Sequence, residues 1–195
     1  KILIGLTNYQ SQHLARQGIT RKVEIIPYGP DLDKFTMKEH RTRVDGYQFI
    51  HIGNHNLLKD QFTLLKTFCK ISAGLPNSKL RIIGYDALNG ELRKYTTQLG
   101  IDHLVEFTGS VPYNDIPHYL QEADVILHTS VFEGQATVIS EAAAAGVLLA
   151  GTRVGLLYDL GDKYGIIVEP GDADGLAEKV LSTIEDPRAF LSYIT

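Results

Sequence analysis

From Tyr47 onward, short runs of β-branched and other apolar residues alternate with longer stretches in which apolar residues recur at helical spacing. Short apolar runs between turn residues are typical of buried parallel strands, and the longer stretches are typical of crossover helices. The expected strands cover residues 48–53, 79–85, 104–109, 124–130, 147–152 and 165–170. The expected helices cover residues 60–74, 89–99, 114–123, 137–145 and 173–185. This order predicts an α/β fold, a doubly wound parallel sheet of about six strands with helices on both faces.

The first 46 residues have a different pattern. The short apolar runs ILIGLT and KVEIIPYG predict two strands, and YQSQHLARQG between them predicts a helix. The following YGPDLDKFTMKEHRTRVDG is charged and rich in turn residues, as connecting segments are. We therefore expect a linker over residues 31–46, a sheet-forming domain over residues 47–187, and a tail over residues 188–195.

Composition and charge exclude several classes of partner. Lys and Arg number 19, Asp and Glu number 23, and no basic run is present that would follow a nucleic-acid backbone. Nucleic acid is therefore not expected as a partner. The single cysteine cannot form a disulfide within the chain, and no apolar run reaches the ~20 residues of a membrane span. We expect a cytoplasmic protein, with peripheral membrane contact left open for the intact protein.

The common signatures of metal and ATP sites are missing from the sequence. The seven histidines show no H-E-x-x-H or Cys-His spacing, and neither Walker A nor G-x-G-x-x-G occurs. Asp31 and Asp33 fall in the linker after Pro30, where a turn with solvated acids is expected. His128 is expected as a core histidine with satisfied hydrogen bonds, and a catalytic role is the alternative. We predict no metal and no cofactor.

The stretch FEGQATVISEAAAAG places Glu133 and Glu141 eight residues apart at the start of an expected helix. It follows strand 124–130, and loops at the carboxyl ends of parallel strands carry the ligand sites of such sheets. Gly134 would let a ligand approach the backbone, and Thr137 would cap the helix whose first N–H groups face that ligand. Carboxylates are good hydrogen-bond partners for sugar hydroxyls. The alternative is that the helix dipole alone favours acids here.

FEGQATVISEAAAAGV resembles the E-x7-E signature of the group 1 family of retaining nucleotide-sugar glycosyltransferases, which have the two-domain GT-B fold. Further segments resemble the same family in the same order. They are IIPYGPDLDKF, FIHIGNHNLLKDQFTLLKTF, LRIIGYD, VEFTGSVPYNDIPHYLQEADVILHTS and GIIVEPGDADGLAEKVLSTIEDP. The resemblance covers about residues 20–187. It implies that residues 47–187 form the Rossmann-like, C-terminal donor-binding domain and that residues 1–30 are a remnant of the N-terminal domain, towards which the tail 188–195 would lead.

The resemblance also implies roles for individual residues. Glu133 would contact the donor sugar, Glu141 would hold the ribose hydroxyls, and Lys59 would neutralise the diphosphate. Glu133 and Lys59 are thus the expected catalytic residues. The other expected donor-binding residues are Gly53, Asn54, Tyr85, Gly109, Val111, Gly134, Gln135, Ala136 and Thr137.

Two places depart from the family pattern. Asn54 stands where the family usually has an arginine, so the diphosphate loses a bidentate cationic partner unless another cation, with Arg153 as the candidate, replaces it. Gln135 and Ala136 stand where an aromatic residue and a glycine are common, which would reshape the sugar pocket.

The function that the resemblance implies is transfer of a hexosyl group from a UDP- or GDP-type nucleotide diphosphate-sugar to an acceptor. The reaction would proceed with retention of configuration and serve polysaccharide or glycoconjugate synthesis. The sugar or lipid-linked acceptor would bind the N-terminal domain, so this fragment alone would bind the donor without completing turnover. Two alternatives remain: a nucleotide-sugar epimerase of GT-B fold, and a non-catalytic nucleotide-sugar-binding module.

Overall fold

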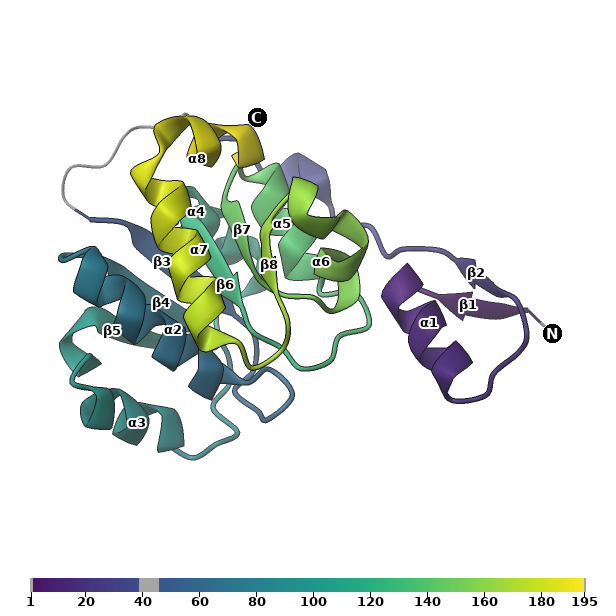
Figure 1. Cartoon of the computed structure of the whole chain (residues 1–195), viewed down its shortest axis with the longest axis horizontal. Coiled ribbons are helices and arrows are strands. Elements are labelled where there is room, and N and C mark those ends of the chain that lie inside the picture. The colour runs from purple at the N-terminus through teal and green to yellow at the C-terminus, as the bar shows by residue number, and fades with distance from the viewer. Residues whose placement is uncertain (1, 39–45, 195) are drawn as a thin grey trace.

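A six-stranded parallel sheet forms the body of the molecule, as the sequence predicts (Figure 1). The computed structural model describes residues 2–38 and 46–194, so positions 39–45 of the expected linker lie outside the described residues. The strands are β3 (Gln48–Ile52), β4 (Lys79–Ile83), β5 (Val105–Gly109), β6 (Val125–His128), β7 (Leu148–Thr152) and β8 (Ile166–Val168). Each lies within a stretch that the apolar pattern predicts.

The order of the strands across the sheet is β5-β4-β3-β6-β7-β8. The chain builds outward from β3 through β4 to β5, and then returns to continue on the other side of β3 with β6. The connections that leave β3 and β6 therefore diverge at their carboxyl ends. In open α/β sheets this point is the crevice where ligands bind.

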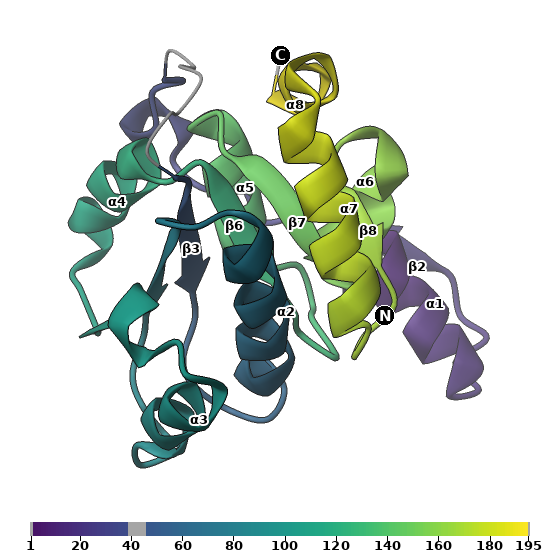
Figure 2. The ribbon, with the colours of Figure 1, turned by 60° about the vertical axis from the view of Figure 1, so that its left-hand side comes forward.

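Helices cover both faces of the sheet (Figure 2). The five expected helices are α2 (Gln61–Gly74), α3 (Glu91–Leu99), α4 (Ile116–Glu122), α5 (Thr137–Ala144) and α7 (Ala173–Glu185). Alternate residues of the central strands divide into two apolar clusters: Phe49 packs with the side of α2 and α7, and Ile50 packs with the side of α4 and α5. Because successive side chains of a strand point to opposite faces, one continuous apolar run supplies both cores.

Two further helices do not appear in the sequence prediction. Helix α6 (Gly155–Leu160) is only six residues long, too short to show a helical period. Helix α8 (Pro187–Ile194) occupies the segment expected as a tail, and Ile194 joins the core on the side of α7. The Asp186 carboxylate accepts a hydrogen bond from the backbone N–H of Arg188 at 2.9 Å, and Pro187 stands at the first helical position. This Asp-Pro pair is a start signal that the prediction missed.

The N-terminal residues form a small unit beside the sheet, seen at the right of Figure 1. Strands β1 (Leu3–Gly5) and β2 (Val23–Ile25) pair in parallel, and α1 (Asn8–Arg16) connects them. The strand-helix-strand order is the one predicted. Short 3-10 turns complete the described chain: η1 (Leu32–Lys34), η2 (Asp102–Leu104), η3 (Tyr113–Asp115) and η4 (Gly161–Lys163).

Within residues 2–38 and 46–194, no helix combines the length and the apolar character that crossing a bilayer requires.

Candidate active site

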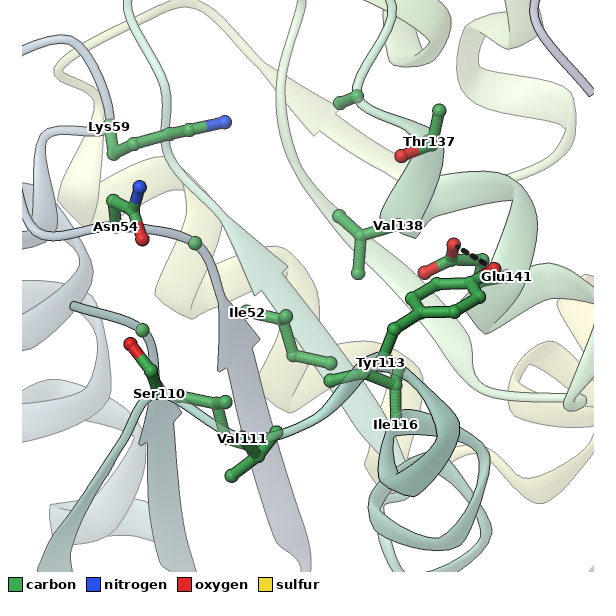
Figure 3. A pocket seen from close by; sticks show the side chains of 14 residues that line it. Ile52, Asn54, Lys59, Ser110, Val111, Tyr113, Ile116, Thr137, Val138 and Glu141 are labelled. Carbon is green, nitrogen blue, oxygen red and sulfur yellow. Dashed lines mark hydrogen bonds between the residues drawn. The ribbon is translucent and has the colours of Figure 1, made fainter. Parts of the chain in front are cut away.

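A cavity of about 360 Å³ lies at the carboxyl edge of the sheet, where β3 and β6 diverge. It is lined by the ends of β3 and β4, the segment after β5, and the first half of α5 (Figure 3). We call it the donor cavity. Its lining residues are Ile52, Gly53, Asn54, Lys59, Ile83, Gly84, Ser110, Val111, Tyr113, Ile116, Ala136, Thr137, Val138 and Glu141.

The cavity brings together about half of the site residues proposed from the sequence. Those that line it are Gly53, Asn54, Lys59, Val111, Ala136, Thr137 and Glu141. The others lie nearby without lining it: Tyr85, Gly109, Glu133, Gly134 and Gln135. Sequence reasoning missed Tyr113, for which the chain gave no motif, and the apolar floor of Ile52, Ile83, Ile116 and Val138. These four residues belong to apolar stretches of strands and helices, and such stretches predict core packing rather than a cavity wall.

Glu133 does not line the cavity itself, but it contacts Lys59, which does. Three donors meet at its Oε1 atom: the Lys59 ammonium, Ser130 Oγ at 2.8 Å and His128 Nε2 at 3.1 Å. Burial alone would raise the pKa of Glu133, but the hydrogen bonds and charges of His128 and Lys59 outweigh it and lower the pKa to about 2. Glu133 is therefore a fixed, ionised carboxylate at neutral pH.

The ionised Glu133 in turn holds Lys59 in place. Figure 3 shows the Lys59 side chain extending from the loop after β3 toward the side of the cavity where Thr137 lies. Its ammonium pairs with Glu133 and the residue lines the cavity, so a positive charge is held beside the cavity wall. An anionic ligand there would find a cation whose position is already set.

A second buried histidine supports the loop that carries Asn54 and Lys59. His51 donates from Nδ1 to the Leu127 carbonyl at 2.9 Å, and its Nε2 accepts from the Gln61 amide at 3.2 Å. The same amide donates to the Asn54 carbonyl at 3.0 Å. Burial, aided by the electrostatic interaction with the neighbouring His128, lowers the pKa of His51 to about 3. His51 is thus neutral, and its tautomer fixes the start of the loop.

Asn54 has a structural contact of its own. Its Oδ1 accepts a hydrogen bond from the backbone N–H of Tyr85 at 3.2 Å, which joins the ends of β3 and β4. The two backbones approach closely here, because a Cβ on Gly84 would lie 2.1 Å from the Gly53 carbonyl oxygen. Only a glycine fits at position 84, whose φ is +150°.

Glu141 is buried on the first turns of α5 and lines the cavity. Its Oε1 accepts a hydrogen bond from the Tyr113 hydroxyl at 3.0 Å (Figure 3). Burial raises the pKa of Glu141, and the hydrogen bond from Tyr113 partly opposes that rise. Glu141 is therefore easier to protonate than Glu133, although the two acids belong to one motif.

The loop between Glu133 and Thr137 differs from the predicted one in how the helix starts. Thr137 is already helical, and the capping position is Ala136, with φ at 67°, ψ at 75° and no side-chain capping bond. The expectation that Thr137 caps α5 is therefore wrong. The reason is the left-handed backbone at Ala136, which turns the chain one residue earlier and leaves Thr137 facing the cavity.

Gln135 is buried and fastens this loop to the segment before the linker. Its side-chain Oε1 accepts from the backbone N–H of Tyr28 at 2.7 Å, and its Nε2 donates to the Tyr28 carbonyl at 2.6 Å. On the other side of the loop, Gly155 packs so closely that a Cβ there would lie 2.7 Å from Glu133 Cβ. The backbone of residues 133–136 is thus held from both sides.

A second cavity, of about 620 Å³, adjoins the first. It shares Tyr113, Thr137 and Glu141 with the donor cavity, and residues 28–31 close its other side. Asp31 is among its lining residues, and no group of three or more His, Cys, Asp or Glu side chains within residues 2–38 and 46–194 is arranged to hold a metal.

Arg153 does not take the place of the missing arginine. Its guanidinium pairs with Asp162 at 3.1 Å and with Glu169 at 3.0 Å, and it is not among the residues that line the donor cavity. Among the described lining residues, the only cationic side chain is that of Lys59.

Comparison with known proteins shows which family the chain resembles. The family model of the group 1 glycosyl transferases matches residues 33–193. A GDP-mannose-dependent monoacylated alpha-(1-6)-phosphatidylinositol monomannoside mannosyltransferase from Corynebacterium glutamicum is 30% identical over 137 residues, covering 66% of this chain and 35% of that protein. A GDP-mannose-dependent alpha-(1-6)-phosphatidylinositol monomannoside mannosyltransferase from Mycolicibacterium smegmatis is 25% identical, covering 92% of this chain and 51% of that protein. The chain thus spans about half or less of these relatives.

Solved structures agree with the observed fold. HepE from Anabaena, in complex with UDP and glucose, superposes with a TM-score of 0.83 at 22% identity, covering 99% of this chain and 56% of HepE. The C-terminal domain of LpcC, a group 1 glycosyl transferase from Francisella tularensis, superposes with a TM-score of 0.76 at 22% identity, covering 86% of this chain and 93% of that domain. Because the family model matches residues 33–193 and the parallel sheet agrees with the solved structures, the chain belongs to the group 1 glycosyltransferases.

Proposed function

We propose that this chain is the donor-binding part of a glycosyltransferase and that the donor cavity takes a nucleotide diphosphate-sugar of UDP or GDP type. The observation that carries the proposal is the placement of Lys59 and Glu141 on the walls of one cavity that also contains the start of α5. A cation and a helix N-terminus suit a diphosphate, and a carboxylate suits the hydroxyls of a ribose.

The donor would lie with its diphosphate near Lys59 and the first amides of α5. Its ribose would meet Glu141, and its base would rest near Ser110 and Val111 above the apolar floor. When the bond between sugar and diphosphate breaks, negative charge grows on the departing phosphate. Lys59 and the helix N-terminus would stabilise that charge, which is electrostatic stabilisation of the transition state.

Glu133 would act on the sugar end of the donor. It is ionised and held through one oxygen by Lys59, Ser130 and His128, so that, among the contacts of the described residues, the other oxygen is left to accept from a sugar hydroxyl. A carboxylate fixed in this way orients the sugar and favours positive charge at its ring. We assign it no covalent role. Transfer with retention of configuration is part of the proposal.

The relatives support the choice of donor. The curated relatives are named as GDP-mannose-dependent mannosyltransferases, and HepE is described with UDP and glucose. The full enzyme would transfer the sugar to a sugar or lipid-linked acceptor bound by an N-terminal GT-B domain, of which residues 1–30 are a part. We place the protein in the cytoplasm and leave contact with a membrane open for the intact protein.

Isothermal titration calorimetry of this chain with UDP and with GDP tests the proposal. We predict that at least one of them binds, and that Glu141→Ala and Lys59→Ala each weaken binding about tenfold or more, because each removes a charged hydrogen-bonding partner. Lys94→Ala is the matched control, since Lys94 is an exposed lysine paired with Glu91 outside the cavity.

Thermal unfolding of every variant accompanies the titrations, because Lys59 also neutralises a buried carboxylate. Loss of binding with a native-like unfolding midpoint supports the site. Titrations of both variants that match the wild type would overturn it.

A non-catalytic nucleotide-sugar-binding module is the second candidate, and Asn54 is the observation that favours it. The usual arginine is replaced by an amide that anchors Tyr85, and Arg153 is engaged elsewhere. A full-length protein that binds donors but releases no nucleotide diphosphate with any acceptor would support this candidate.

A further inference from the structure

Tyr113 lies at the boundary between the donor cavity and the second cavity. It is the first residue of η3, the residue is 44% exposed, and it lines both cavities together with Thr137 and Glu141. The family pattern used to predict the site gave it no role. Its hydroxyl nevertheless makes the one described hydrogen bond to the Glu141 carboxylate, at 3.0 Å.

The Tyr113 ring is itself held by the linker. The Lys34 ammonium lies 5.3 Å from the centre of the ring, an arrangement in which a cation is attracted to the aromatic face. The same ammonium contacts Asn114 Oδ1 at 3.4 Å and the Asp31 carboxylate at 3.5 Å. Tyr113 is thus contacted at its ring by Lys34 and at its hydroxyl by Glu141, and these two contacts limit the directions in which the phenol can point.

This contact has two consequences for Glu141. A glutamate has several rotatable bonds, so an anchor on Oε1 limits the directions in which the other oxygen can point. A donated hydrogen bond also favours the ionised carboxylate, against the effect of burial. Both consequences matter for a ligand hydroxyl, which donates best to an ionised oxygen already in position.

Resting on the proposed donor site, we infer that Tyr113 is a positioning residue: its hydroxyl holds Glu141 so that one carboxylate oxygen faces the ribose hydroxyls, and it thereby favours ribonucleotides over 2′-deoxyribonucleotides. The phenol lines both cavities and donates its hydroxyl proton to Glu141 Oε1. Glu141 contacts the nucleotide, and Tyr113 acts through Glu141.

The other charged and titratable groups around Glu141 lie across the two cavities. Lys59 lines the donor cavity with it, and Tyr28 and Asp31 line the second cavity with it. Asp31 is an exposed acid with Lys34 beside it. A pH effect that requires the Tyr113 hydroxyl can therefore be separated from these groups by a substitution that removes the hydroxyl alone.

The test compares wild type, Tyr113→Phe, Glu141→Ala and Tyr119→Phe by calorimetry with UDP, GDP and their 2′-deoxy analogues from pH 5 to pH 8. Tyr119 is the matched control, a partly buried tyrosine on α4 that packs on Arg81 and does not line the cavity. We expect Tyr113→Phe to weaken ribonucleotide binding roughly fivefold to tenfold and deoxyribonucleotide binding much less.

The pH dependence of ribonucleotide affinity is a second measurement, and a residue with a purely structural role would leave it unchanged. Without the hydroxyl, burial acts on Glu141 unopposed, so the loss of ribonucleotide affinity on acidification begins at a higher pH in Tyr113→Phe than in wild type. Tyr119→Phe keeps both the wild-type profile and the wild-type preference for ribose.

The outcomes separate the inference from the donor site on which it rests. If Glu141→Ala binds UDP and GDP like wild type, the role of Glu141 in the donor site fails, and the donor site as a whole fails if Lys59→Ala does so too. If Glu141→Ala weakens binding but Tyr113→Phe retains the wild-type ribose preference and pH profile, only the role of Tyr113 is overturned. A Tyr113→Phe variant that weakens all nucleotides equally and unfolds at a lower temperature also overturns it, because such a residue only supports the fold.

Discussion

The Glu133 carboxylate carries a pH dependence that a substitution can isolate. Burial would raise its pKa, but His128 and Lys59 lower it from 4.5 to about 2. Because the folded-state pKa is depressed, the stability that the charge contributes is present above about pH 4.5 and is lost as the pH falls toward about 2. We predict that Glu133→Gln lowers the free energy of unfolding at pH 7 by about 2 kcal/mol, after allowing for solvent screening.

Urea unfolding of wild type and Glu133→Gln at pH 7, 5 and 3 measures this difference. It should shrink as the pH falls through the window. Glu169→Gln serves as the control, because Glu169 is an exposed partner of Arg153 and its removal should cost about 0.5 kcal/mol or less. A difference for Glu133→Gln that stays constant over the three pH values would show that the lost group is not acting through its charge.

At the scale of single residues, the sequence predicted Glu133, Glu141 and Lys59, but it did not predict the distant residues that contact them or their loop. The spacing of Glu133 and Glu141 and the position of Lys59 are local features, and local features can be read from a chain. Tyr113 reaches Glu141 across 28 positions, and Gln135 reaches Tyr28 across 107. Contacts of that range depend on where the elements pack, which residue patterns alone do not specify.

The turn into α5 stores backbone strain at Ala136. Its φ of 67° lies in the left-handed region, which costs a residue with a Cβ about 1–2 kcal/mol and costs glycine almost nothing. We predict that Ala136→Gly raises the free energy of unfolding by roughly 0.5–1 kcal/mol, after subtracting the extra chain entropy of glycine. Chemical denaturation at neutral pH is the measurement.

Ala143→Gly is the control for the sign of this effect. Ala143 is exposed inside the same helix, so glycine there should lower the free energy of unfolding by about 1 kcal/mol. If Ala136→Gly is destabilising by a similar amount, residue 136 does not have the left-handed backbone assigned to it.

The elements were predictable where an apolar run or a helical period marks them in the sequence. All six sheet strands and the five longer helices of the sheet domain follow from apolar runs and helical periods. Helix α6 has six residues and no readable period, and α8 was taken for a tail because its start signal at Asp186 and Pro187 was not weighed. The α5 start was placed correctly, but its capping mechanism depends on one dihedral angle at Ala136, and no residue pattern reports that angle.

At the scale of the whole molecule, two relations shape the site: the order of the strands in the sheet, and the contact of the N-terminal unit with the Glu133 loop. The strand order places β3 beside β6, so the loop with Lys59 and the loop with Glu133 face each other. The N-terminal unit then closes on the Glu133 loop, because the Thr7 hydroxyl donates to the Gly134 carbonyl at 2.7 Å. The parallel-strand pattern predicted that both loops lie at the carboxyl edge of the sheet, but it predicted neither the strand order nor the contact with the N-terminal unit.

The Asp159 carboxylate, on α6, joins the N-terminal unit to the sheet domain at the start of α1. It accepts the backbone N–H of Asn8 at 2.7 Å and that of Tyr9 at 3.1 Å, two groups with no partner inside the helix. A negative charge at this end also suits the helix dipole. We predict that Asp159→Ala frees α1 from α6 and increases amide exchange in residues 8–16 roughly tenfold, the effect of losing a cap of ~1–2 kcal/mol.

Hydrogen–deuterium exchange followed by mass spectrometry distinguishes docking from general stability. Peptides from α2, in the core of the sheet domain, should exchange as in wild type, because local opening of α1 leaves that core intact. Asp162→Ala is the matched control, an exposed acid three residues further on that pairs with Arg153 and not with α1. Unchanged exchange in α1 would show that Asp159 does not hold the unit, and faster exchange in α2 as well would show that the substitution destabilises the whole fold. Only the selective result means that the N-terminal unit rests on α6 through a contact that can open independently of the sheet.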